Sequence, residues 1–213
     1  MKRILITGPS GMGKTTLMNH ISLDYKMSSV GIGIIPLMQK YFPGENVSNH
    51  KSVIELMKKD PFKGLKVQFE LLMGRQLLFG NRLNESFVTD RGHIDSLVYT
   101  SDQVFPYLDM DDPETRILKD KFIKKARSIH RFFTHIIFIP YLEGWKFEDN
   151  GVRIIDPEYQ LYISQKFQII LAPFMEPDIQ VIPDVDFGPK VLLLESHDFE
   201  QRFQRTKKFI ANE

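Results

Sequence analysis

The sequence contains no cysteine among its 213 residues. This absence excludes disulfide bonds, thiolate metal sites and cysteine nucleophiles, and it fits a reducing compartment. An excess of charge of one sign is also missing, because 28 basic residues are balanced by 27 acidic residues and the net charge is +1. The composition therefore excludes a field over the whole protein that would attract nucleic acid or an anionic membrane, although it is compatible with a local basic patch.

Long apolar runs are absent as well. Near the start of the chain, Lys2-Arg3 is followed by three apolar residues before Thr7. A signal peptide needs a longer apolar run, and no stretch approaches the roughly 20 residues of a membrane span. Internal repeats and low-complexity segments do not occur. With 42% hydrophobic and 26% charged residues, the composition is that of a globular protein, and we expect a cytoplasmic protein without a membrane partner.

Short apolar segments alternate with segments of helical periodicity along the chain. We expect strands at residues 4–6, 30–35, 86–89, 136–139 and 179–182. We expect helices at residues 13–25, 52–59, 61–83, 156–171 and 199–210, and a further helix that starts at Asp112 and carries an apolar stripe to Phe133. Residues 191–194 fit either a strand or the entry to the last helix. The alternation predicts an α/β protein with a parallel sheet of about five strands, helices on both faces, and a single domain over residues 1–213.

The first loop of this pattern carries a phosphate-binding motif. Residues 8–15 read Gly-Pro-Ser-Gly-Met-Gly-Lys-Thr and match G-x-x-x-x-G-K-[ST] at every fixed position. Glycines let several backbone N–H groups converge on phosphate oxygens, and the helix that follows directs its N-terminus at the same anions. Lys14 would supply charge to the β- and γ-phosphates, and the Thr15 hydroxyl a Mg²⁺ ligand. The expected nucleotide-binding residues are Gly8, Ser10, Gly11, Met12, Gly13, Lys14, Thr15 and Thr16.

A carboxylate follows the third expected strand. P-loop enzymes use such a group at the C-terminal end of a strand that neighbours the phosphate loop. Asp90 would either hold Mg²⁺, directly or through water, or take a proton from an acceptor hydroxyl. Arg91 would bind a phosphate or the acceptor. A capping aspartate followed by a surface arginine is the alternative, and the phosphate loop upstream favours a functional pair.

The two motifs together carry a family resemblance. Residues 8–16, and the run Val88-Thr89-Asp90-Arg91-Gly92 followed by Asp95 and Tyr99, resemble the P-loop nucleoside and nucleotide kinases. The resemblance is strongest to the branch that contains the nicotinamide riboside kinase domain of bacterial NAD-biosynthesis regulators. It implies the three-layer P-loop NTPase fold with a lid segment. It also implies an enzyme that uses ATP and Mg²⁺ to phosphorylate a nucleoside or nucleotide-like acceptor.

The resemblance covers about residues 1–172 and continues weakly into residues 200–202. It also implies an acceptor pocket along the long helix that precedes the Asp90 strand. The residues that it places there are Gln68, Glu70, Arg75, Arg91 and Asp95. For Gln68, Glu70 and Arg75 a solvated polar helix face is an equally good interpretation. Residues 30–85 otherwise depart from the family pattern, so the sequence does not identify the acceptor.

Residues 141–155 are the expected lid. Apolar residues alternate around Asn150-Gly151, which is a strong signal for a two-residue hairpin turn. The resembling kinases have an Asp-Gly-x-Arg-like lid element after the fourth strand, and residues 150–153 stand at that place. Arg153 would then reach the transferring phosphoryl group, where positive charge stabilises the transition state. An ordinary hairpin with a solvated arginine is the alternative. Together with Lys14, Asp90 and Arg91, Arg153 completes the expected catalytic set.

Two other functions remain open at this level. A kinase acting on a modified base or an end of a nucleic acid would need a basic groove, and the Lys/Arg-rich segment 119–131 is its best support. A nucleotide-dependent regulatory switch would need the phosphate loop but no acceptor pocket. The six histidines show no metal-site spacing, and we interpret them as structural or surface residues. The basic residues of segment 202–208 are interpreted as a solvated helix face.

Overall fold

The computed structural model describes residues 1–147, 156–175 and 188–211. Its centre is a five-stranded sheet with the strand order β2-β3-β1-β4-β5, and every neighbouring pair is parallel. The strands are β1 (Arg3–Thr7), β2 (Ser28–Ser29), β3 (Phe87–Thr89), β4 (His135–Phe138) and β5 (Lys190–Leu193). Parallel neighbours require crossover connections, and helices supply them in this chain.

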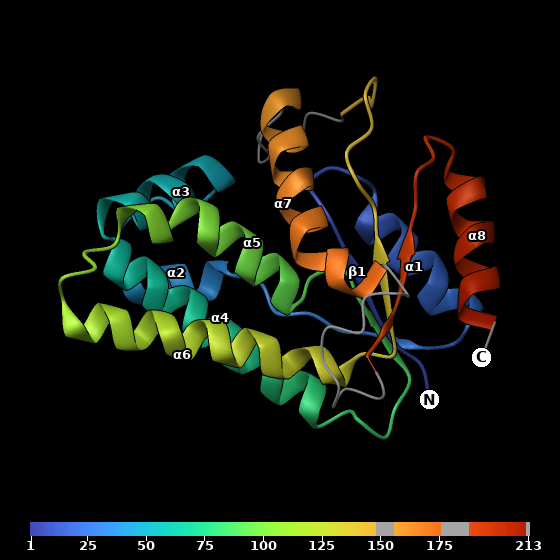
Figure 1. Ribbon diagram of the computed structural model, residues 1–213, viewed down its shortest axis with the longest axis horizontal. Helices are drawn as coiled ribbons and strands as arrows, with labels where there is room; N and C mark the ends of the chain where they lie inside the picture. Colours follow the sequence, from blue (N-terminus) through green and yellow to red (C-terminus); the bar gives the residue numbers. More distant parts are fainter. Residues whose placement is uncertain (148–155, 176–187, 212–213) are drawn as a thin grey trace.

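Helices cover both faces of this sheet, so the fold has three layers (Figure 1). One face carries α1 (Lys14–Asp24) and α8 (Phe199–Ala211), which pack against each other. The other side of the molecule carries α2 (Ile35–Tyr41), α3 (His50–Lys59), α4 (Pro61–Gly80), α5 (His93–Gln103), α6 (Pro113–Ile129) and α7 (Pro157–Met175). The short 3₁₀ helices η1 (Phe105–Tyr107) and η2 (His130–Phe132) follow α5 and α6. The α/β fold class with helices on both faces of the sheet is therefore confirmed.

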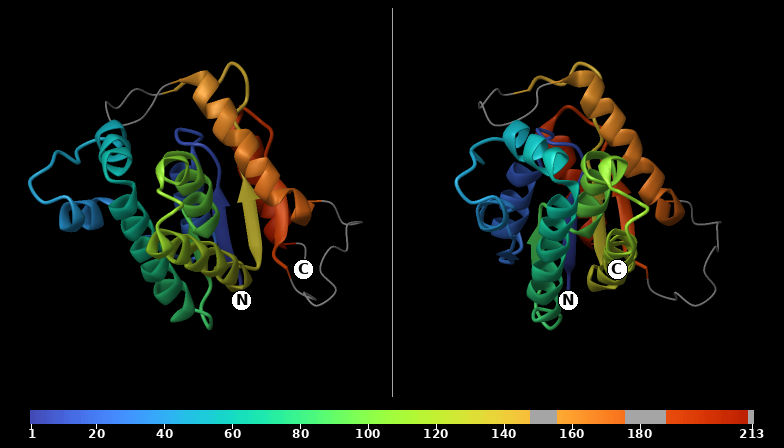
Figure 2. Two further views of the ribbon diagram at one scale, coloured as in Figure 1. Left: turned by 60° about the vertical axis from the view of Figure 1, so that its left-hand side comes forward. Right: turned by 90° about the vertical axis from the view of Figure 1, so that its left-hand side faces the viewer.

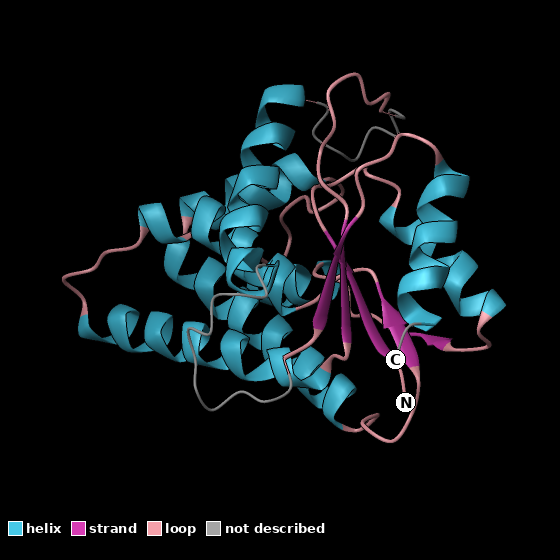
Figure 3. Ribbon diagram, turned by 45° about the vertical axis from the view of Figure 1, so that its right-hand side comes forward, coloured by secondary structure: helices cyan, strands magenta, loops and turns pink. Residues whose placement is uncertain are grey.

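The sheet has a hydrophobic core on each face, because successive side chains of a strand point to opposite faces. Ile4, Ile6 and Ile137 face α1 and α8, whereas Leu5 and Ile136 face the larger helical layer. All five side chains are fully buried. Because both faces are covered, the inner strands β1, β3 and β4 carry uninterrupted apolar segments, as expected for a parallel sheet, whereas the edge strand β2 consists of two exposed serines. Figure 3 shows the sheet enclosed between the two layers.

The larger layer is held together by helix packing. Helices α4 and α6 lie side by side (Figure 2), and α5 packs against α4, α6 and α7. Asp60, Asp112 and Asp156 accept hydrogen bonds from backbone N–H groups at the starts of α4, α6 and α7. Each of these aspartates precedes a proline, which suits a first helical turn because proline lacks the N–H that would otherwise be unpaired there. None of the described helices is long and apolar enough to cross a membrane.

The second strand differs from the sequence-based expectation. Residues 30–35 were the expected strand, but β2 is Ser28–Ser29 and α2 begins at Ile35. Only the Val30 N–H still bonds to the sheet, 3.0 Å from the Val88 carbonyl oxygen. Two glycines weaken the strand in this segment, and Pro36 starts the next helix rather than ending a strand.

The last strand settles an open alternative. Residues 191–194 fitted a strand or a helix entry, and the structure gives β5, with Val191 opposite Ile136. The strand expected at residues 179–182 lies outside the described residues. Helices α2 and α5 had no expectation, because α2 is short and α5 starts directly after the Asp-Arg-Gly turn without a side-chain cap at its Gly92 N-cap.

A histidine pair joins α5 to η2, with His93 buried and His130 half-buried. His93 Nε2 lies 3.0 Å from His130 Nδ1, and His93 also stacks on Phe133. Burial lowers the pKa of His130 to about 4. Burial, with smaller contributions from His130 and Arg75, holds the pKa of His93 well below its usual range. The folded protein therefore keeps both rings neutral at pH values where the unfolded chain protonates them.

We expect this pair to make the fold sensitive to acid. Between about pH 6.5 and pH 4 the unfolded chain binds protons that the folded chain does not, so stability falls as the pH falls. For His130 alone the loss between pH 7 and pH 5 should be about 2 kcal/mol. Urea unfolding at the two pH values should show a smaller loss for His130→Gln. The exposed His20 on α1 supplies the control His20→Gln, and an equal loss in both variants would contradict this assignment.

Candidate active site

The phosphate loop connects β1 to α1 at the carboxyl edge of the sheet. Gly8, Gly11 and Gly13 all have positive φ angles, of 138°, 85° and 78°. Gly8 also needs its missing side chain, because a Cβ there would lie 2.2 Å from the Ile139 carbonyl oxygen next to β4. The glycines of the motif thus allow positive φ angles, and at Gly8 the missing side chain lets the loop pack directly against the backbone of Ile139.

Lys14 lies inside this loop. Its side chain is 8% exposed, and its ammonium group donates to the carbonyl oxygens of Gly8 and Pro9 at 2.7 Å and 2.5 Å. The cation is therefore directed into the loop. This is where the phosphates of a nucleotide bind in a loop of this type.

The Asp90 side chain contacts the first turn of α1. It directly follows β3, which pairs with β1 so that Leu5 lies opposite Thr89. The parallel register places the ends of both strands together, and the Thr15 hydroxyl donates a hydrogen bond to Asp90 Oδ2. A hydroxyl and a carboxylate in contact are hard oxygen ligands of the kind that Mg²⁺ prefers. The residues present therefore fit a magnesium ion at this place.

The Asp-Arg-Gly turn continues into buried polar contacts. Asp95 Oδ2 accepts from the Thr7 hydroxyl at 2.9 Å and from the Gly92 N–H at 3.0 Å. Arg75 Nη1 donates to the Gly92 carbonyl at 2.8 Å and to the Ser96 hydroxyl at 2.5 Å. Burial raises the pKa of Asp95 and lowers the pKa of Arg75 to about 10. These contacts fix the turn between β3 and α5.

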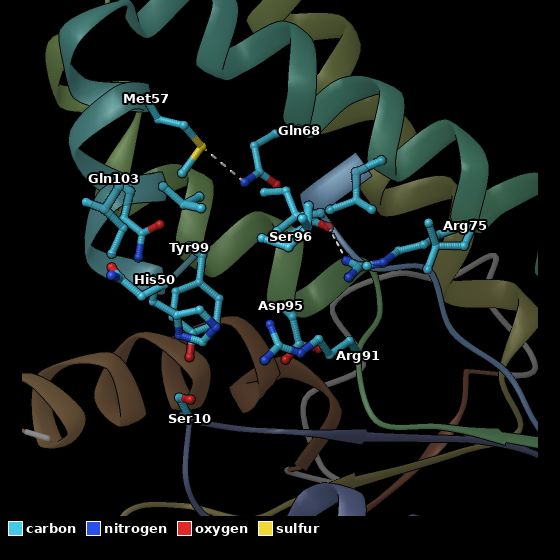
Figure 4. Close-up of a pocket in the computed structure, with 18 of the residues that line it drawn as sticks. Ser10, His50, Met57, Gln68, Arg75, Arg91, Asp95, Ser96, Tyr99 and Gln103 are labelled. Carbon is cyan, nitrogen blue, oxygen red and sulfur yellow. Dashed lines mark hydrogen bonds between the residues drawn. The ribbon is translucent and has the colours of Figure 1, made fainter. Parts of the chain in front are cut away.

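A cavity of about 300 Å³ opens beside the phosphate loop. Its walls come from the loop itself, the segment between β2 and α2, and helices α3, α4, α5 and α7. Ser10 of the phosphate loop lines its edge, and Figure 4 shows the Tyr99 hydroxyl directed at Ser10. Other labelled residues include Gln68, Arg91 and Asp95. The cavity is thus continuous with the phosphate site.

The far wall of the cavity carries carboxamides among apolar side chains. Gln68 is 4% exposed, and the hydrogen bond found for its Nε2 goes to the thioether sulfur of Met57, at 3.6 Å. Gln103 is 7% exposed and donates to the Tyr159 hydroxyl at 3.0 Å. Thioether sulfur is a weak acceptor. A ligand with polar atoms along one edge would give the buried Gln68 carboxamide stronger hydrogen bonds than the thioether does.

The structure brings together most of the expected site residues. Gln68, Arg75, Arg91 and Asp95 line the cavity next to Ser10. Arg75 reaches it from α4 but is already bonded to backbone and serine oxygens. Met12 of the phosphate loop is fully buried, and Thr16 is exposed on α1. Arg153 and the hairpin turn at residues 150–151 lie outside the described residues.

Glu70 is the expected acceptor residue that the structure does not bring to the cavity. It turns away from Gln68 on α4 and pairs with Lys40 at 2.7 Å, and it accepts from the Tyr41 hydroxyl at 2.8 Å. The physical reason is helical geometry, since residues two apart do not share a helix face. Its partners Lys40 and Tyr41 lie on α2, a helix that was not expected from the sequence, so this pairing was not foreseeable.

Several lining residues were missed from the sequence. They come from α3 with its N-cap, from α5 and from α7, and they have no common motif: Asn49, His50, Met57, Ser96, Gln103 and Tyr159. The helical phase of Ser96, Tyr99 and Gln103, which are three or four residues apart on α5, is the signal that could have found some of them. This spacing could be used only once residues 93–103 were known to form a helix.

Comparison with known proteins identifies structures that share this fold. The sequence matches no protein-family model and no curated protein. The structure matches solved kinases over nearly its whole length. A deoxyadenosine kinase from M. mycoides with bound dATP superposes with a TM-score of 0.61 at 16% identity, covering 99% of both chains. The chain shares its fold with this deoxyadenosine kinase. That fold agrees with the three-layer prediction.

A second type of protein also matches in structure. NadR protein in complex with NR superposes with a TM-score of 0.59 at 17% identity, covering 97% of this chain and 50% of the NadR chain. The present chain therefore spans about half the length of NadR. The same deoxyadenosine kinase with dCMP and dCDP gives a TM-score of 0.62 at 16% identity. At these identities the likeness concerns the fold.

Proposed function

We propose that the protein is an ATP- and Mg²⁺-dependent phosphotransferase that moves the γ-phosphate to a nucleoside or nucleotide-like acceptor. Residues 1–213 would form a single kinase domain. The observation that carries the proposal is the continuity of the cavity with the phosphate loop, since Ser10 belongs to both. About 300 Å³ is the size of a small-molecule site. A binding module that only senses its nucleotide has no use for a second cavity at this point.

On the donor side, the roles follow from charge and position. Lys14 would leave its carbonyl partners to bind the β- and γ-phosphates. Thr15 and Asp90 would hold Mg²⁺, which when bound neutralises charge on the phosphates and orients them. Arg91, which is exposed at the cavity mouth, would stabilise charge that develops on the transferring group. We assign the same role to Arg153.

On the acceptor side, a base is needed if the acceptor is a hydroxyl. Asp95 is the one carboxylate among the described residues that line the cavity. Its raised pKa makes it a better proton acceptor than a solvated aspartate, but one of its oxygens already holds the turn. Asp90, next to Thr15, is the other candidate. Either carboxylate would remove the proton while the loop positions the phosphate.

The cavity chemistry favours a heteroaromatic acceptor. Gln68 offers a donor and an acceptor on one planar group, which complements the polar edge of a nucleobase or a nicotinamide ring. Tyr99 and Met57 supply apolar surface beside it. Structures with the same fold were solved with NR, dATP or dCTP. These ligands are of the class proposed.

The nucleic-acid alternative rests on the basic helix α6. No residue of α6 is among the described residues that line the cavity, so its positive charge does not lead to the phosphate loop. The regulatory-switch alternative rests on the phosphate loop alone. A switch would hydrolyse ATP slowly and would phosphorylate no acceptor.

A panel of nucleosides, nucleotides and oligonucleotides with labelled ATP tests the proposal. We expect at least one nucleoside or nucleotide to become labelled. Gln68→Leu should then raise the KM for that acceptor by about tenfold, because it removes the polar edge from a buried site. The KM for ATP should not change. Gln76→Leu on the same helix is the matched control, since Gln76 does not line the cavity.

The panel separates the three functions. Labelling of oligonucleotides alone would favour the nucleic-acid kinase. ATP hydrolysis without any labelled acceptor would favour the switch. The absence of both ATP binding and hydrolysis would overturn the proposal as a whole.

A further inference from the structure

The carbonyl groups of the phosphate loop have partners outside the loop. A phosphate loop turns its N–H groups inward to the anion, so several of its carbonyl oxygens point outward and need donors. The Lys14 ammonium group donates hydrogen bonds to the carbonyl oxygens of Gly8 and Pro9. The Gly11 carbonyl accepts from the indole Nε1 of Trp145 at 3.1 Å, and the Met12 carbonyl accepts from Arg202 Nη1 at 2.8 Å. Both donors come from segments far along the chain.

Arg202 is unusual for an arginine on a C-terminal helix. Its side chain is 2% exposed, its Nε donates to the Ser196 carbonyl at 2.5 Å, and its guanidinium lies 4.3 Å from the centre of the Trp145 ring. Its Nη2 is buried without a hydrogen-bond partner among the described residues. No carboxylate of the described part of the chain forms an ion pair with it. A buried cation without a counter-charge is costly unless an anion lies near.

Trp145 and Arg202 form one unit, which we term the loop bracket. The guanidinium stacks on the indole ring, and each group holds one of two consecutive loop carbonyls. Phe147 adds to the contact on the same side, because a Cβ on Gly11 would lie 3.0 Å from its ring. Rotating the Gly11–Met12 or the Met12–Gly13 peptide would break one of these two hydrogen bonds and would turn the following N–H away from the phosphate site.

We propose that Arg202 and Trp145 are positioning residues for the donor phosphates. They hold the carbonyls of Gly11 and Met12 outward and so direct the N–H groups of Met12 and Gly13 at the anion. The uncompensated charge of Arg202 adds to the positive field of the loop. This inference rests on the proposed function only in that a phosphate-bearing donor binds at residues 8–15.

The test measures binding of ATP and of inorganic triphosphate to the intact protein by calorimetry. Arg202→Met keeps the side-chain stem but removes the donor and the charge, and we expect the Kd of both ligands to rise by about tenfold or more, to a similar extent. Trp145→Phe keeps an aromatic ring but removes the indole N–H, and a rise in Kd of about threefold is expected. Arg205→Met is the matched control, because Arg205 is exposed on the same helix and donates to Leu193 instead of to the loop.

Tryptophan emission gives a second readout. Trp145 is the only tryptophan in the chain, so a spectral change on adding triphosphate reports on the bracket alone. We expect such a change in the wild type and in Arg205→Met, and a different or absent change in Arg202→Met. A purely structural role for Arg202 would lower the melting temperature and leave the Kd values of the folded protein unchanged.

The outcomes are distinct. Unchanged Kd values in Arg202→Met and Trp145→Phe, with a wild type that binds ATP, would overturn the bracket and leave the proposed function standing. Weaker binding of ATP with unchanged binding of triphosphate would also overturn it, because the residues would then serve the nucleoside. A wild type that binds neither ligand would overturn both. If Arg202→Met does not fold, Trp145→Phe decides the question.

Discussion

Replacing Lys14 by alanine should abolish phosphoryl transfer while the fold persists. Lys14 is the cation that the loop itself encloses, and its ammonium group already lies within 2.7 Å of two loop carbonyls. Losing a preorganised charge of this kind lowers the rate by about 10²-fold or more. The measurement is turnover with the acceptor found in the panel, together with circular dichroism and ATP titration.

Lys207→Ala is the matched control for this experiment. Lys207 lies on α8 and pairs with Asp24 at the end of α1, at 3.0 Å, so its loss removes a surface cation from the same layer without touching the loop. Its rate should stay within about twofold of wild type, as expected for an exposed ion pair. If Lys14→Ala were as active as Lys207→Ala with a normal spectrum, the phosphate-loop function would be wrong.

Replacing Asp90 by asparagine should reduce the rate of transfer far more than it weakens ATP binding. Asparagine keeps the shape and can still contact the Thr15 hydroxyl, but it carries no charge for Mg²⁺ and cannot accept a proton. We expect a loss of about 10²-fold in the single-turnover rate, with an ATP affinity within a few-fold of wild type. The concentration of Mg²⁺ needed for half-maximal rate should rise.

A double variant sharpens this prediction. Thr15 and Asp90 are in direct contact, and groups that act as a unit give non-additive losses. Thr15→Ala combined with Asp90→Asn should therefore cost little more than the more damaging single change. Fully additive losses would show that the two residues act separately. A rate unchanged by Asp90→Asn would leave Asp90 as a structural partner of the first turn of α1.

The sequence could predict the parts of this protein that are dictated by local chemistry. The phosphate loop needs fixed residue types at fixed spacing, so residues 8–15 identify it without tertiary information. The capping aspartates Asp112 and Asp156 start α6 and α7 as expected, because their hydrogen bonds close within three residues. Continuous apolar runs such as β4 identify buried parallel strands.

The parts that depend on packing could not be predicted. The segment at residues 30–35 has the apolar character of a strand, yet only Val30 bonds to β3 and the chain then leaves the sheet. The cavity gathers residues from α3, α4, α5 and α7, and their orientation depends on how those helices pack. Arg202 belonged to a segment interpreted as a solvated face. Its burial depends on Trp145, which is 57 positions earlier in the chain.

The strand order also has a consequence for synthesis of the chain. The first strand made, β1, is the central strand, and its partners are far downstream: Ile4 pairs with Val88 on one side and with His135 on the other. Until both have left the ribosome, β1, whose central residues Ile4–Ile6 are all apolar, has no hydrogen-bonding neighbours. At bacterial or eukaryotic elongation rates that interval is on the order of ten seconds. The nascent chain therefore carries this apolar segment unpaired during that interval, and nascent chains that end before β4 should remain open to proteases and accessible to chaperones.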